Sequence, residues 1–498
     1  MSLIPLDSPY KYVLEGRIVT MGVQGVLDDG AIYIEDGVIN DVRPTSALPP
    51  SGFEQVERIL TGDTLYPGLI ELHNHLPYNA IPLWQLARGF TNNGQWRNNS
   101  TTDYQYALKV QRPAQVLGNT AGLVEAVIRF VECRCLLGGT TTSQGITLVN
   151  VGISSYFPGL IRNVEAPQLA DLPAAGTRIA NPPNDQAGKE AYLANLQNET
   201  CYLQHLSEGT DETARGWFLR LKMNNGDWAI HRSLCGIHSA ALKREDFDIM
   251  VQHGASMVWS PLSNFLLYGN TADIQAVASS GIKVGLGSDW GPSGSKNLLG
   301  ELKVAWLTNL EAGGVFSPQQ LVQMVTSNAA EILGWDQQLG TLEAGKRADI
   351  VAINGKRNDP YLHLIEARET GVTLVVIDGV PRVGQPRIMN HFALTNSELF
   401  MVGGSKRILH LAQENVHPLV AGLTLTEAIN RLSNALDNLP TLANQLGSAL
   451  LQGLGAGDGG SPISPIQLDL DLDEEPVESM VAGMMSDELS PMKLEGIT

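Results

Sequence analysis

Two histidines one residue apart interrupt an apolar run in the segment GLIELHNHLP. On a β-strand successive side chains point to opposite faces, so His73 and His75 share one face, about 7 Å apart along the strand. Neutral imidazole is a common ligand of divalent metals. The spacing therefore indicates a metal site, but a His-x-His pair alone also occurs as ordinary hydrogen-bonded residues, so further ligands are needed.

Residues of ligand types end three other apolar runs. His205 ends TCYLQH, His238 ends LCGIH and Asp289 ends IKVGLGSD. The carboxyl ends of parallel strands meet at one mouth of a barrel, so these side chains would join His73 and His75 there. Several imidazoles together with a carboxylate suit one divalent cation.

Eight strand-like apolar runs between residues 67 and 335 alternate with helical stretches. They cover residues 68–73, 140–146, 159–164, 176–181, 200–205, 234–238, 256–260 and 282–289. Alternating strands and helices predict a parallel sheet, and eight repeats over about 250 residues favour a closed (β/α)₈ TIM-like barrel in an α/β protein. Catalytic groups of such a barrel lie at the carboxyl ends of its strands.

Short β-rich runs with Gly, Asp and Pro turns flank the predicted barrel on both sides. We expect residues 1–66 and 336–385 to be the two halves of one small β-sandwich domain, with the metal-dependent barrel over 67–335 between them. A helical extension is predicted over 386–452. The tail, 453–498, is rich in Gly, Ser, Pro and acidic residues, which predicts disorder.

The composition narrows the class of protein. The chain has 498 residues, 43% of them hydrophobic, which is ordinary for a globular protein, and a net charge of -19, which argues against binding through nucleic-acid phosphates. Four cysteines are too few for a disulfide framework and fit a reducing cytoplasm. No apolar run is long enough for a membrane span. We expect a small-molecule substrate and no nucleic-acid or membrane partner. The sequence is also compatible with a homo-oligomer.

The order and spacing of six motifs resemble the amidohydrolase superfamily, in particular its mononuclear deaminase and chlorohydrolase branch, which includes cytosine, guanine and adenosine-type deaminases and triazine hydrolases. The motifs are PGLIELHNH, HLSEGTDE, GIH, SPLSN, GLGSD and GTLEAGKRADIV. The resemblance implies that one Zn²⁺ or Fe²⁺ ion is bound by His73, His75, His205 and Asp289. No lysine ends the fourth predicted strand, so the bridged metal pair of binuclear relatives is not expected.

The resemblance also implies the catalytic roles. Glu208 would shuttle protons to a ring nitrogen and to the leaving amine, and His238 would hold or polarise the hydroxide and the developing oxyanion. Asp289 would accept the water proton while it remains a ligand. A structural reading stands beside each role: Glu208 as a carboxylate at a helix N-terminus, His238 as a core histidine, and Asp289 as a helix cap.

Candidate substrate contacts come from loops that follow the predicted strands. They are Tyr78, Asn79, Trp84, Trp96, Arg97, Gln144, Arg162, Trp290 and Lys296. The aromatic side chains could stack on a planar ring and the basic ones could hold a carboxylate or phosphate, although each residue type is also common in loop packing.

The expected reaction is hydrolytic deamination of an aminated heterocycle by a metal-bound hydroxide. Hydrolysis of an amide, a cyclic amidine or a carbon-halogen bond at the same centre is the alternative, and a non-catalytic scaffold that keeps the barrel is a third.

Overall fold

The computed structural model describes residues 3–86, 89–97, 106–145, 159–413, 416–455 and 489–497. Within these residues, eight short parallel strands form a three-stranded and a five-stranded sheet, with orders β5-β6-β7 and β12-β11-β10-β9-β8. The strands are β5 (Leu69–Glu71), β6 (Thr140–Ser143), β7 (Arg162–Asn163), β8 (Gly176–Arg178), β9 (Tyr202–Leu206), β10 (Leu234–His238), β11 (Ser256–Trp259) and β12 (Lys283–Leu286). Each overlaps one of the eight predicted runs.

Backbone hydrogen bonds connect the two parallel sheets at both seams. The amide of Asp289 donates to the carbonyl of His73 at 2.9 Å and links the end of β12 to the end of β5. The amide of Ala175 donates to the carbonyl of Val164 at 3.0 Å and links β7 to β8. This is a TIM-barrel-like α/β fold, in which strands buried on both faces, such as LCGIH, are apolar throughout.

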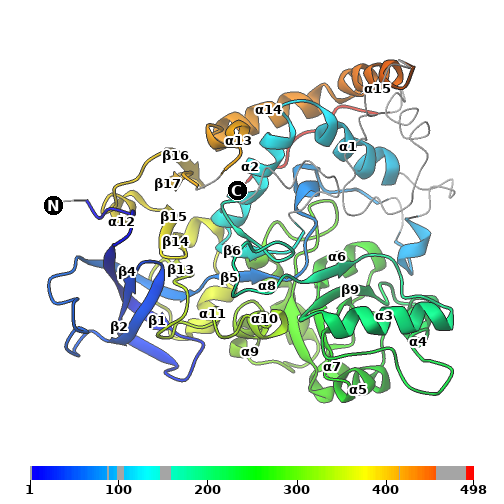
Figure 1. Cartoon of the computed structure of the whole chain (residues 1–498), viewed down its shortest axis with the longest axis horizontal. Coiled ribbons are helices and arrows are strands. Elements are labelled where there is room, and N and C mark those ends of the chain that lie inside the picture. The colour runs from blue at the N-terminus through cyan, green and yellow to red at the C-terminus, as the bar shows by residue number, and fades with distance from the viewer. Residues whose placement is uncertain are drawn as a thin grey trace.

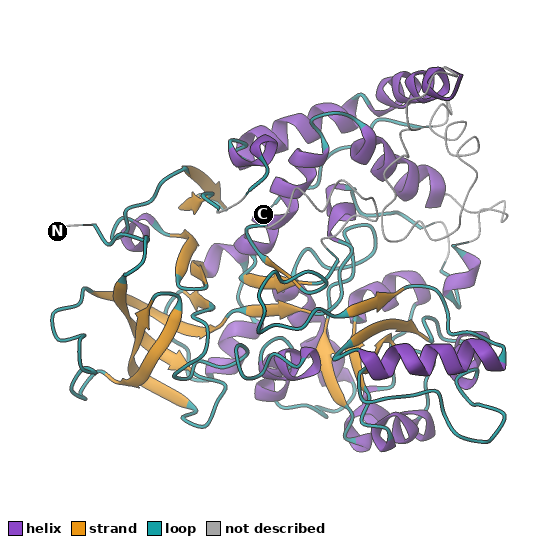
Figure 2. Cartoon of the chain, in the orientation of Figure 1, coloured by secondary structure: helices purple, strands orange, loops and turns teal. Residues whose placement is uncertain are grey.

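Helices surround these strands on the outside, as the purple ribbons of Figure 2 show. Those of the barrel region are α1 (Arg112–Asn119), α2 (Val124–Leu137), α3 (Gln186–Asn198), α4 (Glu212–Leu219), α5 (Arg244–Gln252), α6 (Pro261–Tyr268), α7 (Ile274–Ser280), α8 (Leu298–Glu311), α9 (Pro318–Gln323) and α10 (Ser327–Leu333). Several begin at a side-chain cap; Asp211, for example, accepts a hydrogen bond from the amide of Ala214 at the start of α4. The caps satisfy backbone groups that a helix cannot pair internally.

The two β-rich flanks join in one sheet, which the described residues form with the order β16-β17-β15-β14-β13-β4-β1-β2-β3. Its first strands are β1 (Lys11–Val19), β2 (Val26–Glu35), β3 (Val38–Pro44) and β4 (Arg58–Pro67), and the later ones include β13 (Ile350–Ile353), β14 (Val372–Ile377) and β15 (Val380–Gly384). The two flanks meet where β4 pairs antiparallel with β13. In Figure 1 the blue strands therefore lie beside the yellow ones.

The region predicted as a helical extension contains two strands before its main helices. After α11 (Pro360–Ile365) and α12 (Pro386–Met389), β16 (Ser397–Val402) and β17 (Ser405–His410) form a hairpin that adds to the edge of the sheet. The Gly403-Gly404 turn, with both φ values positive, allows this hairpin, so a wholly helical extension was wrong. The helices α13 (Pro418–Ala421), α14 (Leu425–Asp437) and α15 (Leu439–Gly455) then follow, shown in orange beside α1 and α2 in Figure 1.

Most of the predicted disordered tail, residues 456–488, lies outside the described residues. The end of the tail, 489–497, packs on the barrel region: Leu489 and Ile497 are buried, and the Lys296 ammonium donates to the carbonyl of Gly496 at 3.1 Å. The prediction of disorder is wrong for these residues, because Leu489 joins an apolar cluster with Leu439 of α15 and Ile497 joins the large core cluster. No described helix is both long and apolar enough to cross a bilayer.

Candidate active site

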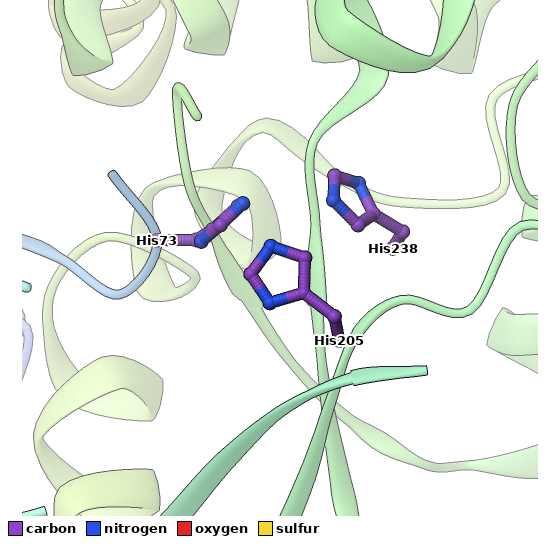
Figure 3. A group of neighbouring side chains, drawn as sticks. All are labelled: His73, His205 and His238. Atoms are coloured by element: carbon purple, nitrogen blue, oxygen red, sulfur yellow. The ribbon is translucent and has the colours of Figure 1, made fainter. Parts of the chain in front are cut away.

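Five polar side chains converge at the carboxyl ends of the parallel strands. The Nε2 atoms of His73 and His75 lie 3.1 and 3.6 Å from Oδ1 of Asp289. The ring centroid of His73 lies 4.7 Å from that of His205 and 5.1 Å from that of His238. Figure 3 shows the rings of His73, His205 and His238 directed toward a shared space. All five side chains are buried.

The backbone around this cluster is held in an unusual conformation. His238 and Asp289 both have φ of +65°, in the left-handed region that is costly for residues with a Cβ and that concentrates at functional sites. Glu71 ties the ends of β5 and β12 together by accepting the amide of Ser288 at 2.6 Å and its hydroxyl at 2.9 Å. A Cβ on Gly287 would lie 2.5 Å from Cβ of His73, so only glycine permits this approach.

The donor set fits a divalent metal ion. The ligand atoms of His73, His75 and Asp289 lie within 4.8 Å of one another, and so do those of His73, His205 and His238. Among the described residues, neither ring nitrogen of His73 has a hydrogen-bond partner, and Nδ1 of His205 has none either. Buried nitrogens without partners are costly, and a metal ion bound by one nitrogen of each side chain would offset part of that cost.

The protonation states also suit a metal. Burial lowers the pKa of His73 and, more strongly, that of His205. Burial alone would raise the pKa of the Asp289 carboxyl, but the neighbouring His73 lowers it well below its usual value. Metal ligands must be neutral imidazoles and ionised carboxylates, and these shifts favour both forms.

Hydrogen bonds fix the position of Asp289 and the tautomer of His238. The Ser263 hydroxyl donates to Oδ2 of Asp289 at 2.5 Å and leaves Oδ1 facing the histidines. The Thr271 hydroxyl donates to Oδ1 of Asn264 at 3.2 Å, and the amide nitrogen of Asn264 lies 3.1 Å from Nδ1 of His238. Because Nδ1 accepts this amide hydrogen, the proton of neutral His238 is on Nε2.

The Glu208 carboxylate lies beside His238, with 3.9 Å between Oε1 and Nε2. Oε1 accepts a hydrogen bond from the Tyr268 hydroxyl at 2.6 Å, and Oε2 accepts one from the side-chain amide of Asn93 at 2.9 Å. No pattern in the sequence marks Asn93 or Tyr268, because neither ends a predicted strand. Asn264 follows β11 within the SPLSN motif, so a fuller use of that motif could have found it.

The candidate ligands other than His73 and the candidate catalytic residues line one small cavity of about 10 Å³. It is lined by His75, Trp96, Arg97, Ile179, His205, Glu208, His238, Asp289 and Trp290. Trp96, Arg97 and Trp290 had been predicted as substrate contacts, and they form part of its wall. A cavity of this volume has room for about one water molecule.

Four other predicted contacts lie behind this wall or beside it. Tyr78 packs on Trp290 with ring centroids 5.4 Å apart, and Trp84 packs on Trp96 at 6.5 Å. The side-chain oxygen of Asn79 accepts the amide of Gly291, and that of Gln144 accepts the amide of Asn74 at 2.8 Å. Tyr78, Trp84 and Asn79 thus support the wall, whereas Gln144 holds the backbone of Asn74 between His73 and His75. None of the four lines the cavity.

The remaining two predicted contacts are engaged elsewhere. The buried Arg162 guanidinium pairs with Asp349 at 2.6 Å and with Asp378 at 2.9 Å. Lys296 reaches the C-terminal segment. Neither residue lines the cavity that contains Glu208.

A barrel-like α/β fold with buried imidazoles and a carboxylate at the strand ends defines a class of metal-dependent hydrolases. The sequence comparisons agree with that class, because the model of the amidohydrolase family matches residues 229–382 of the chain. The resemblance predicted from the motifs is therefore confirmed.

Individual relatives cover most of the chain. It is 25% identical over 394 residues to the 5-methylthioadenosine/S-adenosylhomocysteine deaminase of Desulforudis audaxviator, covering 70% of this chain and 88% of that relative. Among solved structures, the zinc-bound adenosine deaminase from Xanthomonas campestris gives a TM-score of 0.58 at 18% identity, over 78% of this chain and 95% of that one. The triazine hydrolase from Arthobacter aurescens gives 0.59 at 19% identity, over 85% and 99%. These structural likenesses support the fold.

Proposed function

We propose that the protein is a metal-dependent hydrolase that removes ammonia from an aminated heterocycle. The observation that carries the proposal is the position of Glu208 and His238, 3.9 Å apart and lining the same cavity as His75, His205 and Asp289. A proton carrier and a hydrogen-bond donor beside a metal site are what hydrolytic deamination requires. Relatives that are named as deaminases support the same reaction.

His73, His75, His205 and Asp289 would hold one divalent ion, Zn²⁺ or Fe²⁺. When bound, such an ion lowers the pKa of water so that attack occurs near neutral pH. Asp289, held by Ser263, would take a proton from the attacking water. This assignment agrees with the zinc named for the adenosine deaminase structure.

Glu208 and His238 would act on the substrate itself. Glu208 would accept one proton of the attacking water and give it to the ring nitrogen as the water oxygen bonds to the neighbouring carbon. It would then carry the second water proton, first taken by Asp289, to the amine, which leaves as ammonia. The Nε2 hydrogen of His238 would be donated to the oxygen that develops negative charge.

The cavity wall suggests how a planar substrate is held. Trp96 and Trp290 lie 5.9 Å apart at 33°, and we propose that their indole rings contact the heterocycle. Arg97, on the same wall, would hold a carboxylate or phosphate of the substrate. Tyr78, Asn79 and Trp84 would act only by supporting this wall. Gln144 would act by holding the backbone of Asn74 between two of the ligands.

Three broader features belong to the same proposal. The two parallel sheets would close into a (β/α)₈ barrel, because backbone hydrogen bonds join them at both seams. The β-rich flanks would form a sandwich, because their strands enclose one apolar cluster that includes Leu14, Ile32 and Val376. Four free and buried cysteines fit a cytoplasmic location.

The test is ammonia release from metal-loaded protein over a panel of purine nucleosides, purines, pyrimidines, pterins and triazines. We expect turnover of at least one aminated ring, with a product mass that shows an NH group replaced by oxygen. Glu208→Gln should show no turnover. A product that has instead gained a whole water would identify ring opening, and loss of halide would identify hydrolysis of a carbon-halogen bond. Triazines are in the panel because a relative 30% identical over 125 residues is named a triazine hydrolase. Silence of fully metallated protein across the panel would refute deamination and revive the scaffold hypothesis.

A further inference from the structure

Side chains from two distant segments hold the Glu208 carboxylate. The Tyr268 hydroxyl, at the end of α6, donates to Oε1 at 2.6 Å, and the Asn93 amide donates to Oε2 at 2.9 Å. The Trp96 indole nitrogen donates to the Tyr268 oxygen at 2.9 Å. Because an indole N–H can only donate, the single hydroxyl hydrogen of Tyr268 remains directed at Glu208.

The segment that carries Asn93 and Trp96 is itself attached to the Glu208 loop. The amide of Asn93 donates to the carbonyl of Glu208 at 3.2 Å, and the amide of Thr210 donates to the carbonyl of Thr91 at 2.7 Å. Gly209 permits this approach, because a Cβ there would lie 2.5 Å from the Thr91 oxygen and its φ is +142°. These backbone hydrogen bonds hold the loop of Asn93 and Trp96 against the loop of Glu208. The side-chain donors therefore stay close to the Glu208 carboxylate.

We propose that Tyr268, assisted by Asn93 and Trp96, is a positioning residue that aims Glu208 at the substrate and stabilises its ionised form. The inference rests on the proposed function, in which Glu208 carries the proton. Hydrogen bonds to an ionised group are worth more than those to a neutral one, so two donors favour the carboxylate that must first accept a proton. Burial and the nearby Glu208 raise the pKa of Tyr268 well above its usual value, so its hydroxyl stays a donor.

The first experiment compares Tyr268→Phe with a matched control, Tyr12→Phe. Both tyrosines are buried and donate one hydrogen bond, but the Tyr12 hydroxyl donates to the carbonyl of Gly379, in the turn between β14 and β15. We expect Tyr268→Phe to lower kcat by about 10- to 100-fold with a much smaller change in KM, and to move the acidic limb of the kcat profile to higher pH. Tyr12→Phe should keep the kcat and the pH profile of the wild type.

Two further variants test the other donors. Asn93→Asp replaces a donor 2.9 Å from Oε2 with a second carboxylate, so it should move the acidic limb further than Asn93→Ala does. Trp96→Phe should lower kcat in the wild-type background but not further in the Tyr268→Phe background, since Trp96 acts on Glu208 only through the hydroxyl of Tyr268. Any change in KM reports the separate contact of Trp96 with substrate.

The outcomes separate the two proposals. If the wild type releases ammonia but Tyr268→Phe matches Tyr12→Phe in kcat and pH profile, the positioning role is wrong and the proposed function stands. If the wild type is silent on every substrate, the proposed function fails, and the ¹³C NMR titration of the Glu208 carboxyl, assigned with Glu208→Gln, decides the inference. A titration that Tyr268→Phe and Asn93→Asp leave unchanged would overturn it, and a shift to higher pH in both would support it.

Discussion

The tautomer of His238 offers the sharpest prediction, because a chain of hydrogen bonds determines it. The Trp259 indole donates to the Thr271 oxygen at 2.8 Å, so the Thr271 hydrogen is left for Oδ1 of Asn264, and the Asn264 amide donates to Nδ1 of His238. Asn264→Asp replaces this donor with an acceptor. Nδ1 of His238 must then carry the proton, and Nε2 of the neutral ring loses the hydrogen that faces the cavity.

The magnitude follows from what each bond does. The bond between Asn264 and His238 would contribute only about 1 kcal/mol as a neutral pair, but removal of a donor to a developing oxyanion costs roughly 3 to 4 kcal/mol, or about 10²- to 10³-fold in kcat. We therefore expect Asn264→Asp to approach His238→Ala in kcat, whereas Asn264→Leu, which leaves both tautomers available, should lie between Asn264→Asp and the wild type.

Steady-state ammonia release gives kcat and KM, and ¹⁵N chemical shifts of the His238 ring report the tautomer directly. In the wild type the shifts should show a protonated Nε2, and in Asn264→Asp a protonated Nδ1. Wild-type kcat in Asn264→Asp, or an Nδ1 proton on His238 in the wild type, would refute the reasoning from Asn264 to the oxyanion.

Three other predictions concern the metal, a buried ion pair and pH. Addition of Zn²⁺ to metal-free protein at about 100 times its dissociation constant should stabilise the fold by about 2.7 kcal/mol in thermal or urea unfolding, and His205→Ala should lose most of this gain; an equal gain in the variant would contradict the ligand role. Arg162→Met leaves the buried Asp349 carboxylate without its cation, so it should cost roughly 3 to 5 kcal/mol of unfolding free energy. Zinc affinity, measured by titration calorimetry, should be retained, whereas weakened substrate binding without instability would support a contact role. Burial lowers the pKa of His410 to about 4, so the unfolded chain binds a proton at higher pH than the folded chain does. The contribution of His410 to the free energy of unfolding should be complete above about pH 6.5 and fall by at most about 3 kcal/mol toward pH 4. His410→Gln should flatten that part of the pH profile of urea unfolding, whereas an unchanged slope would assign it to other groups.

The parallel strands and the metal cluster could be predicted because both depend on local pattern and simple topology. Apolar runs such as LCGIH read as buried strands, and a polar residue at the end of each run must lie at the mouth if the strands are parallel. His205, His238 and Asp289 are brought together in this way from separate segments. The motif resemblance strengthened the prediction because it supplied the order of the same residues.

The parts that could not be predicted depend on tertiary contacts. Nothing local shows that Tyr268 donates to Glu208, or that Arg162 turns to Asp349 and away from the cavity. The β16–β17 hairpin was missed because two short alternating runs beside longer helical ones were read as part of a helical region. The ordered segment 489–497 was missed because composition describes a whole tail and not the few apolar residues that find a partner.

Anomalous diffraction at the zinc absorption edge from zinc-loaded crystals tests the existence of the metal centre most directly. The expected result is one strong peak about 2.1 Å from a nitrogen of His73, His75 and His205 and at a similar distance from an oxygen of Asp289. No peak among these side chains in protein shown to contain zinc, or a peak bound by other residues, would contradict the metal centre.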